Sequence, residues 1–409
     1  MARERGSVRP PRPNVINEIA HPTRISLSLS IRERAPSLGM RALVECRARI
    51  AYPRAYRRGI KPARRAIRAA AAAARRGAPA VEDENVCDVA IVGAGPGGLA
   101  AALALQRAGL DVRVFEQREE FRPAGVAIFI WPHGLNALKS FDPVSCERVI
   151  EAGAVIDNIA IEQLQPGNTE AEELVKIDVA GWSRRMDLPP QIGITWARLT
   201  NALRAGLKPD TVRLAHRLQD LTDEDGEDGV TLTFEPPRGG GEAPPPVRAR
   251  MCVVGADGRN SRVRELAFGA DEKATVNTYA DPAAPEANVY YALSPNPPPG
   301  ANGAGSFNEL RFSLCDGSGI SLLDVGRGNL DIDGKEGGSG GNPASGGQLM
   351  FGTTRFSEPA MTFETPTARL GHLESLFENT TPLLKAAIAS TEPTAVIQTR
   401  LYERDGASR

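Results

Sequence analysis

The most chemically informative residues of the chain form a glycine-rich segment, Gly93-Ala-Gly-Pro-Gly-Gly98. In such a turn the first glycine permits a tight bend, the second lets the backbone approach a pyrophosphate, and the third lets strand and helix pack closely. A helix that starts there offers unpaired N–H groups to the phosphates. Glu116, which lies 23 residues after Gly93, would accept hydrogen bonds from a ribose hydroxyl. This spacing predicts a dinucleotide site, for NAD or for FAD, and a turn that only connects two elements is the alternative.

The elements that must position these residues follow from the hydrophobic pattern. Residues 88–92 form a short segment rich in β-branched side chains, with Asp88 followed by four apolar residues, which predicts a buried strand. Residues 98–108 favour a helix that ends at Gly109, and residues 111–116 favour a second strand. This order predicts a parallel sheet, so the fold class is α/β with a Rossmann-like domain. The pattern also predicts strands at 212–221, 230–234 and 247–254 and a helix over 370–389.

Three later side chains have a structural and a functional interpretation. Asp257 lies in the turn Gly255-Ala-Asp-Gly258, where its carboxylate would reach a bound ligand or cap the helix that follows. Arg198 lies near the start of an amphipathic helix, where an arginine is most often solvated. Arg122 precedes an apolar strand, and such strands usually belong to the core. The residues taken one by one leave both interpretations open.

Taken together and in this order, the segments resemble the class A flavoprotein monooxygenases, the para-hydroxybenzoate hydroxylase-like family that includes salicylate hydroxylases and zeaxanthin epoxidases. Three matches carry the resemblance, which covers residues 86–409: VAIVGAGPGGLAAALALQRAGLDVRVFEQ, the helix in which leucine follows Arg198, and VVGADGRNSRVRE. The last match is similar to the DG motif of the family.

The resemblance implies an enzyme that holds FAD in its first motif and uses NAD(P)H and O2 to insert one oxygen atom into a small organic substrate, aromatic or isoprenoid-like, through a flavin C4a-hydroperoxide. Because the cofactor carries this chemistry, no catalytic side chain is assigned. The cofactor-binding residues implied by the resemblance are Gly93, Gly95, Pro96, Gly97, Gly98, Glu116, Gln117, Arg122, Arg198, Asp257 and Gly258. The resemblance also implies a second domain built on a mixed or antiparallel substrate sheet.

One family motif is missing. The family has a later Gly-Asp motif that contacts the flavin, and this chain contains no Gly-Asp dipeptide. The stretch 395–408 resembles the segment that leads into that motif. We therefore expect a C-terminally incomplete FAD domain. Two alternatives to the monooxygenase remain, a non-catalytic remnant of the flavin fold and an NAD-dependent dehydrogenase that uses only the first motif.

Charge and composition divide the chain into regions. Residues 1–80 hold 18 Arg and one Lys against four Glu, whereas the whole chain has a formal net charge of −1. Near-neutral charge argues against a nucleic-acid partner. The leader, residues 1–84, is expected to be a transit peptide or a disordered tail. The expected localisation is the plastid, with the mitochondrion or the cytoplasm as alternatives. The domains that follow are expected at 85–274 (FAD-binding), 275–370 (substrate sheet, with a Gly-rich insert at 331–347) and 371–409 (return toward the first domain).

Other classes of site have little support in the sequence. The five cysteines are widely separated, and neither they nor the four histidines have the spacing of metal ligands. No apolar run reaches the length of a membrane span. The predicted ligands are therefore FAD, NAD(P)H, O2 and a small organic molecule, with no metal and no assignment of oligomeric state.

Overall fold

The computed structural model describes residues 26–30, 45–49, 84–121, 127–164, 170–223, 229–268, 288–296, 308–315, 318–327, 347–355, 361–378 and 380–400. The chain divides into two units, Met1–Ala70 and Ala71–Arg409. In the first, strands β1 (Ser26–Ser30) and β2 (Glu45–Arg49) pair antiparallel. The alternation of serine and leucine in β1 is the period-two pattern of a strand.

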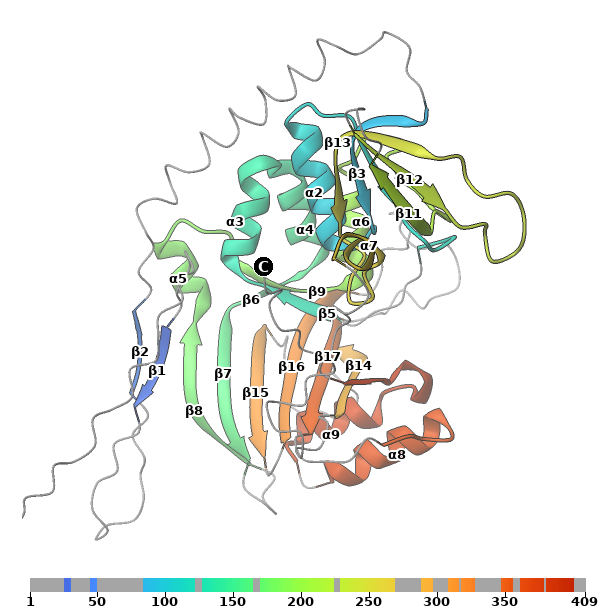
Figure 1. Ribbon diagram of the computed structural model, residues 1–409. Helices are drawn as coiled ribbons and strands as arrows, with labels where there is room; N and C mark the ends of the chain where they lie inside the picture. Colours follow the sequence, from blue (N-terminus) through green and yellow to red (C-terminus); the bar gives the residue numbers. More distant parts are fainter. Residues whose placement is uncertain are drawn as a thin grey trace, which may run out of the picture. The chain divides into compact units, whose positions relative to one another are not determined.

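A six-stranded sheet in the second unit carries the glycine segment. Its order is β10-β4-β3-β13-β12-β11. The first four strands pair in parallel, β12 pairs antiparallel with β13, and β11 pairs antiparallel with β12. The strands are β3 (Val86–Val92), β4 (Val112–Phe115), β10 (Val212–Arg213), β11 (Leu218–Asp223), β12 (Val230–Phe234) and β13 (Val247–Gly255). Helix α2 (Pro96–Arg107) connects β3 to β4, which confirms the predicted strand–helix–strand unit (Figure 1).

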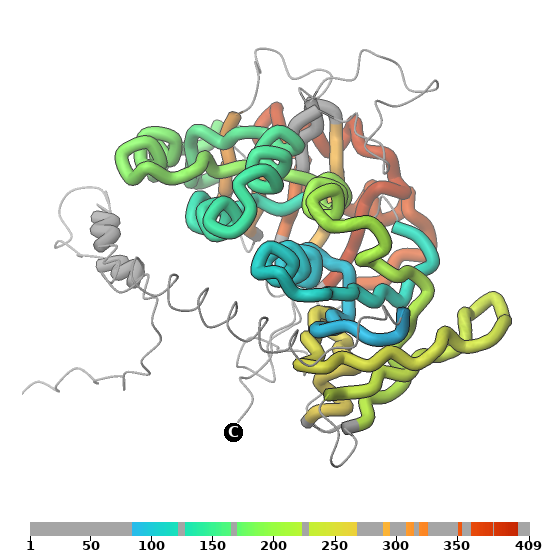
Figure 2. The backbone as a smooth tube through the Cα atoms, turned by 90° about the horizontal axis from the view of Figure 1, so that it is seen from above, coloured from blue at the N-terminus to red at the C-terminus, as the bar shows by residue number. Residues whose placement is uncertain are grey.

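The central strand β3 is buried on both faces because its alternate residues belong to two cores. Val89 and Ile91 pack with the apolar sides of α2 and α6 (Trp196–Arg204), two helices that lie side by side (Figure 2). Ala90 and Val92 pack on the other face with residues of β4, β11, β12 and β13. A strand buried on both faces needs a continuous apolar run, which explains the sequence signal at 88–92.

A seven-stranded mixed sheet forms the second layer, with the order β18-β14-β17-β16-β15-β7-β8. Its strands are β7 (Asn158–Leu164), β8 (Ala171–Asp178), β14 (Asn288–Asn296), β15 (Glu309–Cys315), β16 (Ser318–Arg327), β17 (Gly347–Arg355) and β18 (Ile397–Arg400). The mixed sheet was predicted, but β7 and β8 come from the range 85–274 assigned to the first domain. β7 pairs in parallel with β15, so the two layers are interleaved along the chain.

A small three-stranded sheet with the order β5-β9-β6 lies against the seven-stranded sheet (Figure 1). Its strands are β5 (Ala127–Ile130), β6 (Ala154–Ile156) and β9 (Gln191–Thr195). Ala127 and Ile156 share a buried cluster with Leu310 and Leu323 of the large sheet. Nearby helices complete this half: α3 (Pro132–Phe141), α4 (Pro143–Ala152) and α5 (Val179–Arg185).

Two of the predicted elements are divided in the structure. The helix predicted over 370–389 is two helices, α8 (Pro366–Leu376) and α9 (Pro382–Ala389), because a proline lacks the N–H that a helix interior needs. Both helices cover one face of the seven-stranded sheet. The strand predicted over 212–221 divides into β10 and β11, because Ala215 between them has a φ of 57°. That left-handed conformation turns the chain from one edge of the six-stranded sheet to the other.

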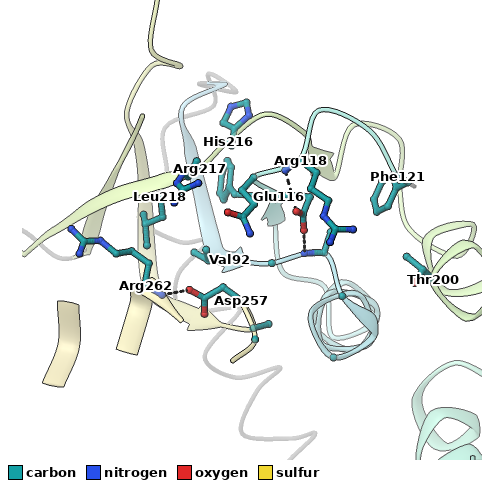
Figure 3. A pocket seen from close by; sticks show the side chains of 18 of the residues that line it. Val92, Glu116, Arg118, Phe121, Thr200, His216, Arg217, Leu218, Asp257 and Arg262 are labelled. Atoms are coloured by element: carbon teal, nitrogen blue, oxygen red, sulfur yellow. Dashed lines mark hydrogen bonds between the residues drawn. The ribbon is translucent and has the colours of Figure 1, made fainter. Parts of the chain in front are cut away.

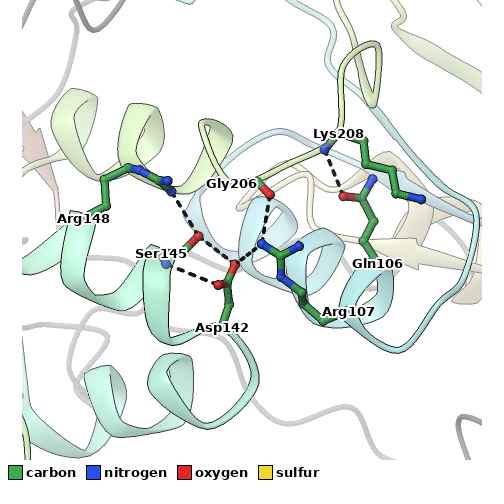
Figure 4. Close-up of polar contacts among 7 residues, drawn as sticks. All are labelled: Gln106, Arg107, Asp142, Ser145, Arg148, Gly206 and Lys208. Atoms are coloured by element: carbon green, nitrogen blue, oxygen red, sulfur yellow. Dashed lines mark hydrogen bonds and ion pairs between the residues drawn. The ribbon is translucent and has the colours of Figure 1, made fainter.

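A buried carboxylate joins α2 to α4 (Figure 4). The Asp142 carboxylate accepts hydrogen bonds from the backbone N–H of Ser145 (3.3 Å), the Ser145 hydroxyl (2.8 Å) and the Arg107 guanidinium (2.9 Å). Burial acts to raise the pKa of Asp142, but these hydrogen bonds outweigh it and hold the pKa below its usual value. The ionised form of Asp142 is therefore linked to the folded state.

We expect Asp142→Asn to lower the free energy of unfolding by about 1–3 kcal/mol at neutral pH, because three donor groups lose a charged acceptor. The sign follows from the lowered pKa. The stabilisation by ionised Asp142 is fully present above the unfolded-state pKa of about 3.9, and it is lost as the pH falls through the folded-state pKa. Urea unfolding at several pH values measures both effects. The control is Glu147→Gln, an exposed position on α4 that should be silent, and a difference that persists in strong acid would contradict the linkage.

Candidate functional site

The glycine segment packs directly on the end of a second strand. Gly93 has a φ of 105°, and a Cβ at this position would lie 2.4 Å from the carbonyl oxygen of Ala256. A Cβ at Gly98 would lie 2.0 Å from the carbonyl oxygen of Gly93. The Gly93 N–H donates to the Phe115 carbonyl (2.8 Å), and the Ala256 N–H donates to the Val92 carbonyl (2.8 Å). These two glycines therefore allow three chain segments to meet without side chains between them.

The other two glycines border open space. A Cβ at Gly95 would have the Cζ2 atom of Trp196 as its nearest neighbour, at 3.9 Å, and a Cβ at Gly97 would have nothing within 4 Å. Gly95 is the N-cap of α2, and no side chain caps the helix there. Pro96, in the first turn, has no N–H to satisfy. The remaining N–H groups of the first turn, with the positive end of the helix dipole, form a cradle for an anion.

The predicted acid lies beside this cradle. The Glu116 carboxylate accepts a hydrogen bond from the backbone N–H of Ala94 (3.0 Å) through one oxygen and from that of Arg118 (3.1 Å) through the other (Figure 3). A carboxylate has about four acceptor positions, so Glu116 retains capacity for the hydroxyls of a ribose. Gln117 lines the same cavity. The structure thus brings together the glycine segment and the acid that the spacing predicts.

The second predicted segment reaches the same cavity through β13, the parallel neighbour of β3. The carboxylate of its acid, Asp257, accepts hydrogen bonds from residues that follow it closely in the sequence. One carboxylate oxygen accepts from the backbone N–H groups of Arg262 (2.6 Å) and Val263 (3.1 Å), at the start of α7 (Arg262–Phe268), and the other accepts from the Ser261 hydroxyl (2.6 Å). Gly258, with a φ of 78°, leaves the cavity open. The structure favours the interpretation of Asp257 as a helix cap, with the turn itself as a wall of the cavity.

Arg198 is not among the residues that line this cavity, and its position near the flavin, which the family resemblance implies, stays a prediction. Its side chain is 6% exposed and donates to the carbonyl of Val325 (2.6 Å) and to that of Ala152 (3.4 Å). Burial lowers the pKa of the Arg198 guanidinium, and the nearby Asp324 acts in the opposite direction. Arg198 thus joins α6 to the seven-stranded sheet. The other predicted arginine, Arg122, lies outside the described residues.

The glycine segment, Glu116 and the turn at Gly258 meet in one cavity of about 520 Å³, a size typical of small-molecule sites. Its walls also contain residues that the sequence reasoning did not select, namely Arg118, Trp196, Thr200, Asn201, His216 and Arg217. The last two come from the turn that Ala215 starts, which the backbone of Glu116 holds by accepting from the His216 N–H (2.8 Å). Burial lowers the pKa of His216, and its hydrogen bond with the Leu214 carbonyl opposes that shift.

The cradle fits the pyrophosphate of a dinucleotide, because Gly95 and Gly97 leave the space that a Cβ would fill. A parallel sheet whose first strand ends in this cradle, with an acid after the second strand, defines a dinucleotide-binding protein of the Rossmann type. Within the described residues, no group of three His, Cys, Asp or Glu side chains is placed to hold a metal ion. No helix in the same ranges is long and apolar enough to cross a membrane.

Comparison with known proteins identifies the class further. The family described as "FAD binding domain" matches residues 86–290, half of the chain. The chain therefore belongs to the FAD-binding domain family of the class A FAD-dependent monooxygenases.

Curated relatives and solved structures are consistent with this family. The 6-hydroxynicotinate 3-monooxygenase of Bordetella bronchiseptica is 32% identical over 188 residues, which cover 45% of this chain and 44% of the relative. The FAD-dependent urate hydroxylase of Klebsiella pneumoniae is 27% identical over 180 residues, which cover 44% of this chain and 42% of the relative. Klebsiella pneumoniae HpxO complexed with FAD and uric acid shares the fold, with a TM-score of 0.56, 20% identity, and coverage of 77% of this chain and 68% of that chain. The chain thus aligns with less than half the length of either curated relative.

Proposed function

We propose that the chain binds FAD and acts with NAD(P)H and O2 as a monooxygenase of a small organic substrate. The observation that carries the proposal is the cradle at Gly95 and Gly97, which lies next to Glu116 in a cavity of about 520 Å³. Membership of the FAD-binding domain family supports FAD over NAD as the resident dinucleotide. Relatives named for urate and 6-hydroxynicotinate hydroxylation support a planar aromatic or heteroaromatic substrate.

Different residues of the site would bind different parts of this cofactor. The backbone of Gly95, Gly97 and the first turn of α2 would hold the pyrophosphate, and Glu116 would orient the adenosine ribose. The chemistry that the cofactor supplies when bound is acceptance of hydride from NAD(P)H and activation of O2 for transfer of one oxygen atom. The protein's part is to bind, to orient and to keep water out. The plastid address of residues 1–84 stays a prediction from composition.

The test is reconstitution of the full chain with FAD. We expect the desalted protein to keep visible flavin absorbance, and we expect NAD(P)H oxidation to increase with an aromatic substrate whose product carries an oxygen atom from labelled O2. A panel of urate, 6-hydroxynicotinate and salicylate is the starting set. A chain that retains FAD but forms no oxygenated product with any donor or substrate would be the non-catalytic remnant. A chain that retains NAD and ignores FAD would be the dehydrogenase.

A further inference from the structure

The helix α6 presents a neutral face to the cofactor cavity. Thr195 caps the helix by accepting from the Arg198 N–H (3.4 Å), and this cap fixes where the helix begins. Four residues of α6 then line the cavity, Trp196, Ala197, Thr200 and Asn201. The charged Arg198 points elsewhere, with its guanidinium on the Val325 and Ala152 carbonyls. The α6 wall of the cavity is therefore made of an indole, a methyl, a hydroxyl and an amide.

Trp196 is the side chain of this wall that lies nearest to the cradle. Its Cζ2 atom is the nearest neighbour, at 3.9 Å, of a Cβ placed on Gly95. The side chain is 42% exposed, although tryptophan is usually well buried. An exposed aromatic ring inside a concave site offers a large, rigid surface to a ligand, and an indole also carries an N–H donor. Trp196 is thus the side chain of α6 best placed to meet a group bound at Gly95.

Most of the cations around the cavity are already paired. Arg217 forms an ion pair with Glu235 (3.0 Å), and Arg262 forms one with Glu265 (3.2 Å) and also donates to the Gln219 carbonyl. Arg118 lies on the Glu116 side of the cavity (Figure 3). A phosphate bound in the cradle is therefore met on one side by backbone N–H groups and on the α6 side by Trp196.

We propose that Trp196 is a cofactor-contact residue, whose indole packs against the phosphate-bearing middle of the bound dinucleotide beside Gly95. This inference rests on the proposed function, since it requires a dinucleotide in the cradle. It assigns a cofactor contact to the first residue of α6, which the sequence analysis did not select. The contact is dispersive, with an N–H donor, so it depends on an aromatic ring and not on charge.

Binding of ligand fragments tests this assignment. We expect Trp196→Ala to raise the Kd for ADP and for FAD about tenfold, the scale of a lost aromatic contact, and to leave the Kd for adenosine within about twofold. Trp196→Phe, which keeps a ring, should stay within about threefold of the wild type for all three ligands. Trp131→Ala is the matched control, because Trp131 is also 42% exposed but does not line the cavity. It should leave the affinity for ADP unchanged.

The outcomes separate the inference from the proposed function. Equal affinities of Trp196→Ala and the wild type for ADP would overturn the inference, and so would an equal loss for ADP and adenosine, which would indicate a distorted cavity. A wild type that binds ADP through Trp196 but rejects FAD would overturn the proposed function and leave the contact standing. A wild type that binds neither ligand would overturn both.

Discussion

We expect Gly98→Ala to lower the free energy of unfolding by about 3 kcal/mol or more, whereas Gly97→Ala should raise it by up to about 1 kcal/mol. The two positions are neighbours on α2 but have opposite surroundings. A Cβ at Gly98 would lie 2.0 Å from the Gly93 carbonyl oxygen, so the backbone of the cradle would have to shift. A Cβ at Gly97 would have nothing within 4 Å, and alanine is the better helix former.

Urea unfolding of the cofactor-free protein, followed by circular dichroism, measures both variants against the wild type. Because the two glycines are neighbours in the first turn of the same helix, propensity and capping effects are closely similar. The sign of the difference therefore reports the contact with Gly93. Destabilisation of similar size at both positions would contradict the close packing of helix on strand described above.

We expect Gly95→Val to remove FAD binding, with a rise in Kd of about 100-fold or more, and to leave the fold intact. The backbone at Gly95 has a φ of −71° and a ψ of 171°, a conformation that valine adopts readily. A Cβ there would make an ordinary contact with Trp196 at 3.9 Å, so the protein accepts the side chain. The space it takes is the space that a pyrophosphate would occupy.

Flavin fluorescence titration gives the Kd, and urea unfolding of the same samples gives the stability. Gly95→Ala is the graded control, which adds one methyl and should have an intermediate effect on binding. If the valine variant bound FAD as well as the wild type, the cradle at Gly95 would not be the phosphate site. If it unfolded far more readily, loss of binding would say nothing about contact with the ligand.

The meeting of the glycine segment, Glu116 and the turn at Gly258 could be predicted from the sequence. Each follows a strand, and the carboxyl ends of parallel neighbours lie at the same edge of a sheet. The order of residues alone could not show which way a side chain points. The Asp257 carboxylate could accept hydrogen bonds equally well from a ligand or from the N–H groups of the next helix. Only the path of the chain after β13 favours the helix.

The side chains of α6 illustrate the same limit. Arg198 and Trp196 differ by two positions, which on a helix is about half a turn, so a charge near the helix start does not reveal which of them faces the cavity. The cap at Thr195 was a usable signal, because it fixes the first turn. Pro382 was also a visible break in the predicted helix. The assignment of β7 and β8 to the second sheet, by contrast, depends on pairing with β15, far along the chain.

The interleaved strands determine when the site can assemble during synthesis. Gly93 rests on Ala256, and β3 has β13 as its parallel neighbour, so the cradle stays without one wall until about 160 residues after it have left the ribosome. In the same way, β7 lacks its parallel neighbour until β15 has been synthesised. A nascent chain that stops before β13 leaves both β3 and β7 with an unpaired edge, a state that favours aggregation or binding by chaperones. Excision of the first 274 residues as a free-standing FAD module would keep β13 beside β3 but leave β7 without β15 permanently.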